Sequence, residues 1–565
     1  MNKILLFLFS VLLLATSAQG GTISPNLEAA LDSKGADEVV SVIVHMTDQA
    51  PIAEIQTQLR AGKATRQHSH AVIISALKDV TRSQEDLLQD LSGRKGSGIE
   101  DFTSYWISNL VVVQATPLEI RRIADRSDVD LVELNFRTEL IEPTDRRNVQ
   151  AGAGGEDLTL SIGITNGLTA INADRVWYEL GITGEGRIVG SLDTGVDGTH
   201  PALADRWRGL THSWQESWHD VVGTVSQFPV DYNSHGTHTT GSMAGVAPND
   251  TVGVAWGSQW IAANPIDQGV GGGFGSDIIN CLQWFADPDG NPETISDVPD
   301  AVCNSWGVSE SFGYPDCYSG WFSVIDNCEA AGVVTLWATG NEGPSSSTVR
   351  SPADRATTAT NSFSVGSVNA NGSYPYTISS FSSRGPSTCN SPAEFLIKPE
   401  VSAPGSGVYS SIPGGGYSYY DGTSMATPHV AGVVALMRQA APNIEVDVIK
   451  QILMDSAHDF GTLGEDNSYG WGFIDAYEAV IQAMQYSFGQ YTGIVSNGSF
   501  GGGPIAGAVV TMDNGVELFD QVTNADGEFG IYAPNGSYDV SVAASGFATS
   551  AATVQMAHPN IINNN

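Results

Sequence analysis

Between residues 170 and 484, short apolar runs rich in β-branched residues alternate with stretches of helical pattern. The clearest examples are the runs at residues 188–192 and 333–338 and the long helical stretch that begins near Ser424. Strands that alternate with helices over this length favour an α/β fold, in which helices cover both faces of a parallel sheet. Functional side chains are then expected at the carboxyl ends of the strands.

A smaller region before this segment also predicts both strands and helices. Residues 39–45, 108–114 and 129–134 have the composition of strands. Thr116, Pro117 and Glu119 predict a helix that begins with a capping threonine and a proline in its first turn. The order of these elements favours a small α+β domain of ferredoxin-like type, with its helices on one face of the sheet.

The pattern changes again after about residue 489, where short alternating strands and tight turns follow one another. The pairs Asn514-Gly515, Asp526-Gly527 and Asn535-Gly536 are typical of hairpin turns. This region predicts a small β-sandwich. In contrast, the polar, glycine-rich stretch at residues 146–155 predicts a linker.

The first residues of the chain predict export. A short basic start is followed by an apolar run at residues 4–14 and by small residues, which is the pattern of a signal peptide cleaved near Ala18 or Gly20. The run is shorter than the roughly 20 residues of a spanning helix, so we expect no membrane span and a secreted, extracellular protein. The formal net charge of -37 argues against nucleic acid and anionic membranes as partners.

Five cysteines suit an exported protein that uses disulfides as local staples. Cys317 and Cys328 are the first choice for a bridge because they lie close together in sequence. Cys281 with Cys303 is an alternative pair, which leaves Cys389 over, and the sequence alone leaves the pairing open.

Three separated segments supply an acid, a base and a nucleophile. Asp193 follows the predicted strand at residues 188–192, His235 precedes a run of small residues, and Ser424 begins the long apolar helix. A serine hydroxyl becomes a nucleophile when a histidine takes its proton and a carboxylate holds that histidine. A metal site at His235 and His238 is disfavoured because Gly236 stands where an HExxH helix has its glutamate. Ser424 also lacks the Gly-x-Ser-x-Gly elbow of lipases.

The order Asp193, His235, Ser424 is that of subtilisin, and the three segments resemble the active-site signatures of the subtilisin (subtilase) family. The resemblance spans roughly residues 170–484, and residues 253–256, 260–263 and 303–307 are similar to bacillopeptidase F-like members. It implies a subtilisin-like serine endopeptidase that acts on proteins or peptides through an acyl-enzyme. No cofactor is expected for catalysis.

The resemblance also suggests which residues surround the nucleophile. Asn341 stands in a segment that matches the family's oxyanion segment, where its amide and the backbone N–H of Ser424 would stabilise the oxyanion. The alternative is a glycine-rich turn that needs an asparagine for its backbone. Ser305, Trp306 and Gly307 resemble one wall of the groove in which the substrate pairs as an added strand.

Arg350 is a departure from the family, because the corresponding segment, residues 345–353, often has a small residue at this position. One hypothesis is that Arg350 points into the specificity pocket and favours Asp or Glu before the cut. The alternative is an arginine that faces solvent or pairs with a local acid.

The outer regions resemble known companions of such peptidases. Residues 39–135 resemble an inhibitor-like prodomain, which would assist folding and act as an intramolecular inhibitor, with cleavage between about residues 135 and 161. Residues 489–555 resemble a carboxypeptidase regulatory-like domain. The expected domains are a signal peptide (1–20), a prodomain (21–136), a linker with the cleavage region (137–169), a peptidase (170–486) and a sandwich (489–557).

Structural calcium is implied by the resemblance and by acidic loops such as residues 287–300, but this loop lacks EF-hand spacing and its ligands stay unassigned. We expect a monomer. A non-catalytic binding protein is the main alternative, and it predicts the loss of Asp193, His235, Ser424 or Asn341, all of which are present. A processing protease with few targets is a second alternative.

Overall fold

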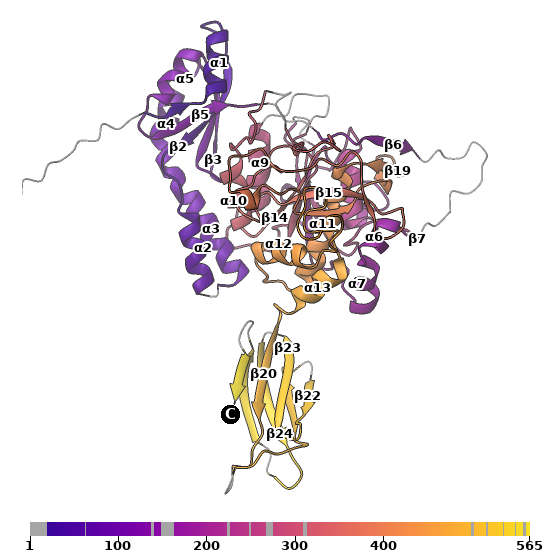
Figure 1. Cartoon of the computed structure of the whole chain (residues 1–565). Helices are drawn as coiled ribbons and strands as arrows, with labels where there is room; N and C mark the ends of the chain where they lie inside the picture. The colour runs from indigo at the N-terminus through magenta and orange to yellow at the C-terminus, as the bar shows by residue number, and fades with distance from the viewer. Residues whose placement is uncertain are drawn as a thin grey trace, which may run out of the picture. The chain divides into compact units, whose positions relative to one another are not determined.

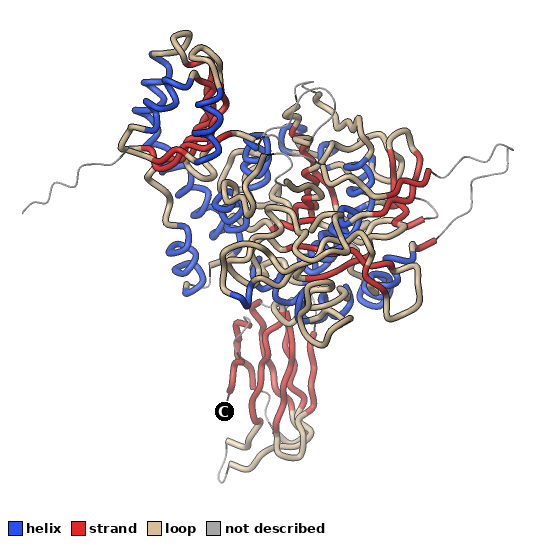
Figure 2. The backbone as a smooth tube through the Cα atoms, turned by 45° about the horizontal axis from the view of Figure 1, so that its top comes forward, coloured by secondary structure: helices blue, strands red, loops and turns tan. Residues whose placement is uncertain are grey.

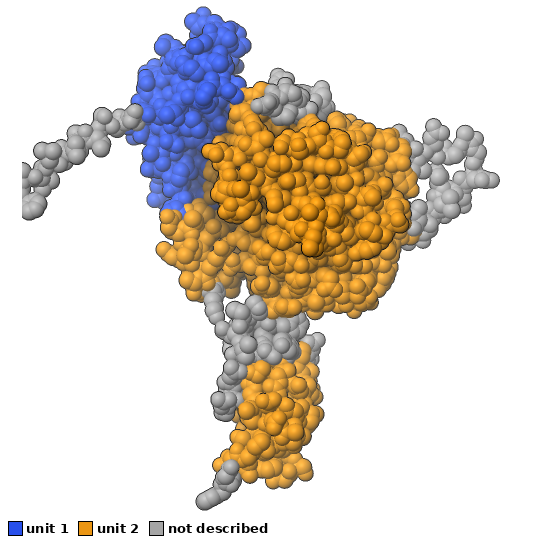
Figure 3. Space-filling view, in the orientation of Figure 1, with its two compact units in different colours: residues 1–51, 76–135 blue, residues 52–75, 136–565 orange. Residues whose placement is uncertain are grey.

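The structure is a computed structural model. It describes residues 20–564 except 63, 137–139, 149–162, 223–225, 248–249, 267–274, 309–312, 499–501, 516–517, 535, 548–549 and 557–560. The predicted signal peptide therefore lies almost wholly outside the described residues. The chain forms two compact units, one of residues 1–51 and 76–135 and one of residues 52–75 and 136–565 (Figure 3).

The first unit contains one five-stranded sheet in the order β1-β5-β2-β4-β3. Its strands are β1 (Thr22–Ile23), β2 (Val40–Met46), β3 (Ile99–Tyr105), β4 (Leu110–Ala115) and β5 (Val129–Leu134). Leaving out the short edge strand β1, the order is that of a ferredoxin-like fold, as the sequence predicted. β3 was not predicted, because its residues are mostly polar and only the two at its ends are buried.

Helices of the first unit pack on one face of its sheet. They are α1 (Pro25–Ser33), α4 (Glu85–Gly93) and α5 (Pro117–Ala124). Leu87 of α4 and Ile120 of α5 share a buried core with Val42 and Val113 of the sheet. The helix predicted at Pro117 begins there, but the Thr116 side chain makes no capping hydrogen bond.

The second unit is built on an eight-stranded sheet in the order β16-β15-β14-β13-β8-β12-β9, with β17 pairing to β15. The strands are β8 (Ile188–Leu192), β9 (Trp218–His219), β12 (Gln259–Ala263), β13 (Ala301–Asn304), β14 (Val334–Ala338), β15 (Ser364–Asn369), β16 (Thr377–Ile378) and β17 (Val401–Pro404). All pairs are parallel except β15 with β16. The predicted parallel sheet is confirmed.

Helices cover both faces of this sheet (Figures 1 and 2). The main ones are α7 (Ala173–Leu180), α8 (His235–Ala244), α9 (Gly275–Ala286), α10 (Phe322–Ala330), α11 (Thr423–Ala440), α12 (Val446–Asp455) and α13 (Ala476–Met484). Val189 of β8 shares a core with Val430 of α11. A side chain at the next position, Gly190, would instead meet Phe285 of α9. Because neighbouring strand residues face opposite ways, α9 and α11 lie on opposite faces.

Residues 52–75 belong to the second unit, although they were predicted as part of the prodomain. They include α2 (Ile52–Ala61), and α3 (Arg66–Val80) begins among them. Arg66 forms an ion pair with Asp300 at 3.0 Å, and His70 contacts the Ala331 carbonyl at 2.9 Å. Contacts between residues this far apart in sequence were not visible in the local pattern.

The C-terminal residues form two facing sheets, as predicted. One has the order β23-β20-β26 and the other β22-β21-β24-β25. The strands are β20 (Phe488–Ile494), β21 (Val509–Asp513), β22 (Leu518–Val522), β23 (Glu528–Pro534), β24 (Gly536–Ala543), β25 (Ser550–Met556) and β26 (Ile561–Asn564). The predicted hairpin turn at Asn514-Gly515 joins paired strands. The turn at Asp526-Gly527 lies between strands of different sheets, because turn residues mark a reversal but not a pairing partner. The third prediction includes Asn535, which lies outside the described residues.

The predicted cysteine pairing is wrong. The disulfide joins Cys317 to Cys389, whereas Cys281, Cys303 and Cys328 are free and buried. Cys328 lies on α10 with its side chain in the core, so nearness to Cys317 in sequence did not bring the two sulfurs together. Burial raises the pKa of the Cys303 and Cys328 thiols, which removes them as nucleophiles.

Candidate active site

Asp193 and His235 are in direct contact at the carboxyl end of β8. The Asp193 Oδ1 lies 2.7 Å from Nδ1 of His235 and also accepts the Thr194 backbone N–H at 2.7 Å. The Thr239 hydroxyl donates to the second oxygen, Oδ2, at 3.3 Å. Both side chains are buried, so the carboxylate fixes the tautomer and orientation of the ring.

Glycine allows this close approach of α8 to the turn after β8. A Cβ on Gly236 would lie 2.1 Å from the Gly195 carbonyl oxygen, which no side chain could tolerate. Gly195 has a φ of +105°, in the left-handed region that favours glycine. The first of the small residues after His235 therefore lets α8 approach the turn after β8.

Asp231 organises the turn that carries His235, and sequence reasoning missed it. Its carboxylate accepts the Thr194 hydroxyl at 3.0 Å and the Ser234 and Thr237 backbone N–H groups at 3.0 and 2.9 Å. It therefore ties the Asp193 segment to the beginning of α8. An acidic residue shortly before a helix start was the only local signal.

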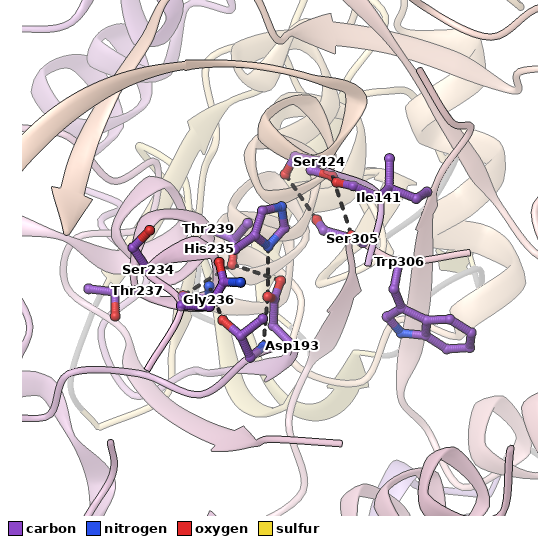
Figure 4. Close-up of polar contacts among 12 residues, drawn as sticks. Ile141, Asp193, Ser234, His235, Gly236, Thr237, Thr239, Ser305, Trp306 and Ser424 are labelled. Carbon is purple, nitrogen blue, oxygen red and sulfur yellow. Dashed lines mark hydrogen bonds and ion pairs between the residues drawn. The ribbon is translucent and has the colours of Figure 1, made fainter. Parts of the chain in front are cut away.

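Ser424 is the second residue of α11 and is buried. Its hydroxyl donates to the Ile141 carbonyl at 3.0 Å and lies 3.3 Å from the Ser305 carbonyl. His235 Nε2 has no hydrogen-bond partner among the residues that the structure describes. Figure 4 shows the His235 ring between Asp193 and the Ser424 side of the site. The aspartate–histidine contact is thus formed, while the serine hydroxyl is engaged with residue 141.

Pro428 lies in the second turn of α11. A proline has no N–H, so the carbonyl four residues earlier, that of Ser424, loses its helical donor. The Ser305 hydroxyl donates to that carbonyl at 2.9 Å in place of the helix. Ser305 thus contacts the backbone of the nucleophile.

Asn341 follows β14 and presents its amide to the same place. Its Oδ1 accepts the Thr423 backbone N–H at 2.9 Å, which orients the side chain. Its Nδ2 then donates to the Glu142 carbonyl at 2.8 Å. A side-chain amide held in this way and pointed at a peptide carbonyl has the geometry of an oxyanion donor.

The chain's own residues 140–148 lie across the site. Leu140 forms an antiparallel bridge with Trp306, and β6 (Asp145–Asn148) pairs antiparallel with β19 (Gly416–Asp421). Between them, the Thr144 N–H donates to the Asp421 carbonyl at 2.7 Å. The predicted linker is therefore an ordered, strand-like segment up to residue 148. Sequence reasoning missed it because these charged residues show no apolar alternation.

Trp306 and Gly307, two of the residues predicted to line the groove, contact different parts of the structure. The Trp306 indole is fully buried against Trp321 and Trp337, so only its backbone faces the segment at Leu140. A Cβ on Gly307 would lie 3.1 Å from the Arg350 Cβ and 3.2 Å from the Ile141 Cδ1, so any larger residue would need its neighbours to shift.

Arg350 forms an ion pair with Glu342, with 2.5 Å between Nη2 and Oε1. Its side chain is 17% exposed. Of the two interpretations of Arg350, this contact matches the one in which the side chain pairs with a local acid, and not the one in which it binds acidic substrates. Glu142, whose backbone carbonyl accepts from Asn341, forms its side-chain ion pair with Arg146 and not with Arg350.

His238 is a structural residue and not a second base. Its Nε2 lies 3.1 Å from two backbone carbonyls, those of Val408 and Ser418, and its ring stacks on Tyr420. Burial lowers the pKa of His238 to about 3, so the ring stays neutral.

The described part of the chain contains no helix with the length and apolarity needed to cross a bilayer.

The fold and the site together define a class of protein. An aspartate, a histidine and a serine lie at one edge of a parallel sheet that is covered by helices. The family model described as "Subtilase family" matches residues 184–472. The chain therefore belongs to the subtilase family of serine endopeptidases, as the sequence motifs predicted.

Individual relatives agree with this assignment. The chain is 32% identical to Bacillopeptidase F of Bacillus subtilis (strain 168) over 459 residues, which cover 78% of this chain but 30% of that protein. It is 32% identical to Subtilisin of Bacillus pumilus over 325 residues, 55% of this chain and 97% of that protein. Among solved structures, fervidolysin from Fervidobacterium pennivorans, a keratinolytic enzyme related to subtilisin, matches with a TM-score of 0.52 and 20% identity, over 93% of this chain and 78% of that one.

Proposed function

We propose that this chain is a secreted serine endopeptidase that cleaves proteins through Ser424, His235 and Asp193. The observation that carries the proposal is the buried contact of 2.7 Å between Asp193 and His235, on the same site as the Ser424 hydroxyl. Export is supported by the apolar run at residues 4–14.

In this mechanism His235 Nε2 takes the proton of the Ser424 hydroxyl as its oxygen attacks the substrate carbonyl carbon. Asp193 keeps Nδ1 protonated and stabilises the imidazolium. The imidazolium then gives its proton to the leaving amine, which departs and leaves an acyl group on Ser424. A water molecule, deprotonated by the same histidine, hydrolyses this ester and restores the serine.

Asn341 and the backbone N–H of Ser424 would stabilise the negative oxygen of each tetrahedral intermediate. The N–H is available because the first N–H groups of a helix have no acceptor within it. The side-chain amide of Asn341 donates to the backbone carbonyl of Glu142 in the structure. Apart from the hydrolytic water, this mechanism uses groups of the chain itself.

We also propose that the enzyme is made as a zymogen and that residues 140–148 block the groove before cleavage. The support is that this segment follows a substrate-like path, paired at Leu140 and at β6. The Ser424 hydroxyl hydrogen-bonds to the carbonyl of Ile141, whereas Asn341 holds that of Glu142. The nucleophile and the oxyanion donor are thus occupied by neighbouring carbonyls, which favours inhibition.

Purified protein incubated with casein tests the proposal, with Ser424→Ala as the control. We expect hydrolysis by the wild type and none above background by the variant. Intact mass should show that the wild type has lost its N-terminal region by a cut before residue 162, whereas Ser424→Ala keeps it. Equal hydrolysis by both proteins would contradict the assignment of Ser424, and an uncut wild type with full activity would contradict the zymogen.

A further inference from the structure

The helical segment at residues 52–75 belongs to the second unit, although the chain on either side of it belongs to the first (Figure 3). It contains α2 and the first part of α3. We propose that residues 52–75 are a second anchor, separate from the substrate groove, that keeps the N-terminal region bound to the peptidase after the linker is cut. The proposal rests on the zymogen proposed above.

Arg66 makes the central contact of this second anchor. Its Nη1 donates to Asp300 Oδ1 at 3.0 Å, and its Nη2 donates to the Gly332 carbonyl at 3.4 Å. The Arg66 side chain is 12% exposed and that of Asp300 is 3% exposed, so the ion pair is largely removed from water. Removing one partner from such a pair leaves a buried charge without compensation, which is costly. Arg66 should therefore contribute more to docking than a surface contact does.

Neighbouring residues extend the contact along both helices. His70, one turn after Arg66, is buried, and its Nδ1 lies 2.9 Å from the carbonyl of Ala331, at the end of α10. The Gln67 side chain donates to the Glu293 carbonyl at 3.1 Å. α2 also packs against α10 (Figure 1). The segment thus contacts the peptidase through side-chain hydrogen bonds and through helix packing.

Arg60 of α2 adds two ion pairs at the surface. Its Nε lies 2.8 Å from Glu445 Oε2 and its Nη2 lies 2.6 Å from Asp447 Oδ2, at the beginning of α12. All three side chains are about half exposed, so these pairs contribute less than the buried pair and weaken as salt rises. The peptidase surface is thus acidic where the segment is basic.

The second anchor lies at the edge of the sheet opposite to the proposed catalytic residues. Asp300 directly precedes β13 and Gly332 lies just before β14, whereas Ser305 directly follows β13. At about 3.3 Å per residue, β13 separates Asp300 from Ser305 by roughly 16 Å. A cut in the linker therefore leaves the contacts of residues 52–75 unchanged.

The connection of the chain explains what the second anchor would hold. α3 continues from Arg66 in the second unit to Val80 in the first, so holding residues 52–75 also holds the first unit covalently. After a cut before residue 162, residues 140–148 belong to the same N-terminal piece. Keeping this piece bound raises the effective concentration of residues 140–148 at the groove. The block of the groove should therefore outlast the first cut.

The peptidase keeps a partner for Asp300 when the second anchor leaves. Arg187 lies just before β8, and its Nη1 is 3.8 Å from Asp300 Oδ1. The backbone N–H of Ile188 donates to the other oxygen of Asp300, Oδ2, at 3.3 Å. The carboxylate thus retains a cation and a donor, which makes release of residues 52–75 compatible with a folded peptidase.

The test uses the intact chain carrying Ser424→Ala, with residues 150–155 replaced by the recognition site of a sequence-specific protease. After complete cutting by that protease, the dissociation rate of the N-terminal piece from the immobilised peptidase piece is measured. Arg66→Gln should raise this rate at least tenfold, and Arg60→Gln about two- to fivefold. The effect of Arg60→Gln should disappear at about 1 M salt, which screens exposed charges.

Arg82→Gln is the matched control, because it removes an arginine of the same N-terminal piece that is 77% exposed and pairs with Asp79. It should leave the dissociation rate unchanged. Residues 140–148 are identical in all these proteins, so differences in rate report the second anchor. Arg60 is exposed, so Arg60→Gln is expected to fold even where Arg66→Gln does not.

An unchanged dissociation rate in Arg66→Gln, or in Arg60→Gln at low salt, would overturn the proposal. The readout is dissociation after cutting by an added protease, so it does not depend on the proposed catalytic function. Absence of casein hydrolysis by the wild type would contradict that function and would leave the measured effect of Arg66→Gln in place.

Discussion

The Ser305 hydroxyl donates a hydrogen bond of 2.9 Å to the backbone carbonyl of Ser424. That carbonyl is available because Pro428, four residues later, has no N–H to donate within the helix. Ser305 therefore compensates for a proline inside α11 and holds the peptide unit of the proposed nucleophile.

Ser305→Ala should lower kcat about two- to tenfold, because a net hydrogen bond contributes roughly 0.5–1.5 kcal/mol. Adding Pro428→Ala restores a helical donor to the Ser424 carbonyl and should recover part of the loss. Steady-state kinetics of the single and double variants measure both effects. Ser258→Ala is the control, since it removes another buried hydroxyl that donates to a backbone carbonyl, that of Ala255. Equal losses in Ser305→Ala and in the double variant would refute the compensation.

Asn341→Ala should reduce kcat by about 10²–10³ with little change in KM if the amide stabilises the developing oxyanion, as proposed. Asn341→Asp distinguishes the effect of the side chain's acceptor from the effect of its donor. It keeps an acceptor for the Thr423 N–H but loses the donor that faces Glu142. We expect it to retain the thermal stability of the wild type and to be no more active than Asn341→Ala. Wild-type kcat in either variant would remove Asn341 from the mechanism.

The disulfide between Cys317 and Cys389 should appear as one linked pair in a non-reducing peptide map. Replacing both cysteines with serine should lower the free energy of unfolding by about 2–4 kcal/mol, since the bridge restrains the unfolded chain. Thermal unfolding in the Ser424→Ala background measures this without autolysis. Cys281→Ser at a free cysteine is the comparison, and the three free thiols should react with alkylating reagents only after denaturation. A linked Cys317–Cys328 peptide would contradict the structure.

His238 should make the protein sensitive to acid. Its pKa is about 3 in the fold, so below pH 6.5 the unfolded chain takes up a proton that the folded chain does not. Its contribution is complete above pH 6.5 and falls by about 1.4 kcal/mol per pH unit toward pH 3. The Tm advantage of the wild type over His238→Gln should therefore shrink as the pH falls from 7 to 4. An advantage that stays constant over this range would show that His238 titrates normally.

The sequence by itself determined the α/β fold and the family, and it predicted Asp193, His235, Ser424 and Asn341 as the catalytic residues. These depend on features that a short window contains: the apolar period of a strand or helix, and the small residues around Asp193, His235 and Ser424. Strand ends in a parallel sheet meet at one edge, so the local motifs also indicated that Asp193 and Asn341 would lie at the site.

Tertiary structure decided what depends on pairs of distant residues. It placed Ile141 on the Ser424 hydroxyl, joined Cys317 to a cysteine 72 positions away, and paired Arg350 with Glu342. It also brought Glu216 to the carboxylates of Asp289 and Asp297. The physical reason is that a local pattern reports which face of an element is buried, while the partner of a charge, a sulfur or an open strand edge is chosen by how the elements pack.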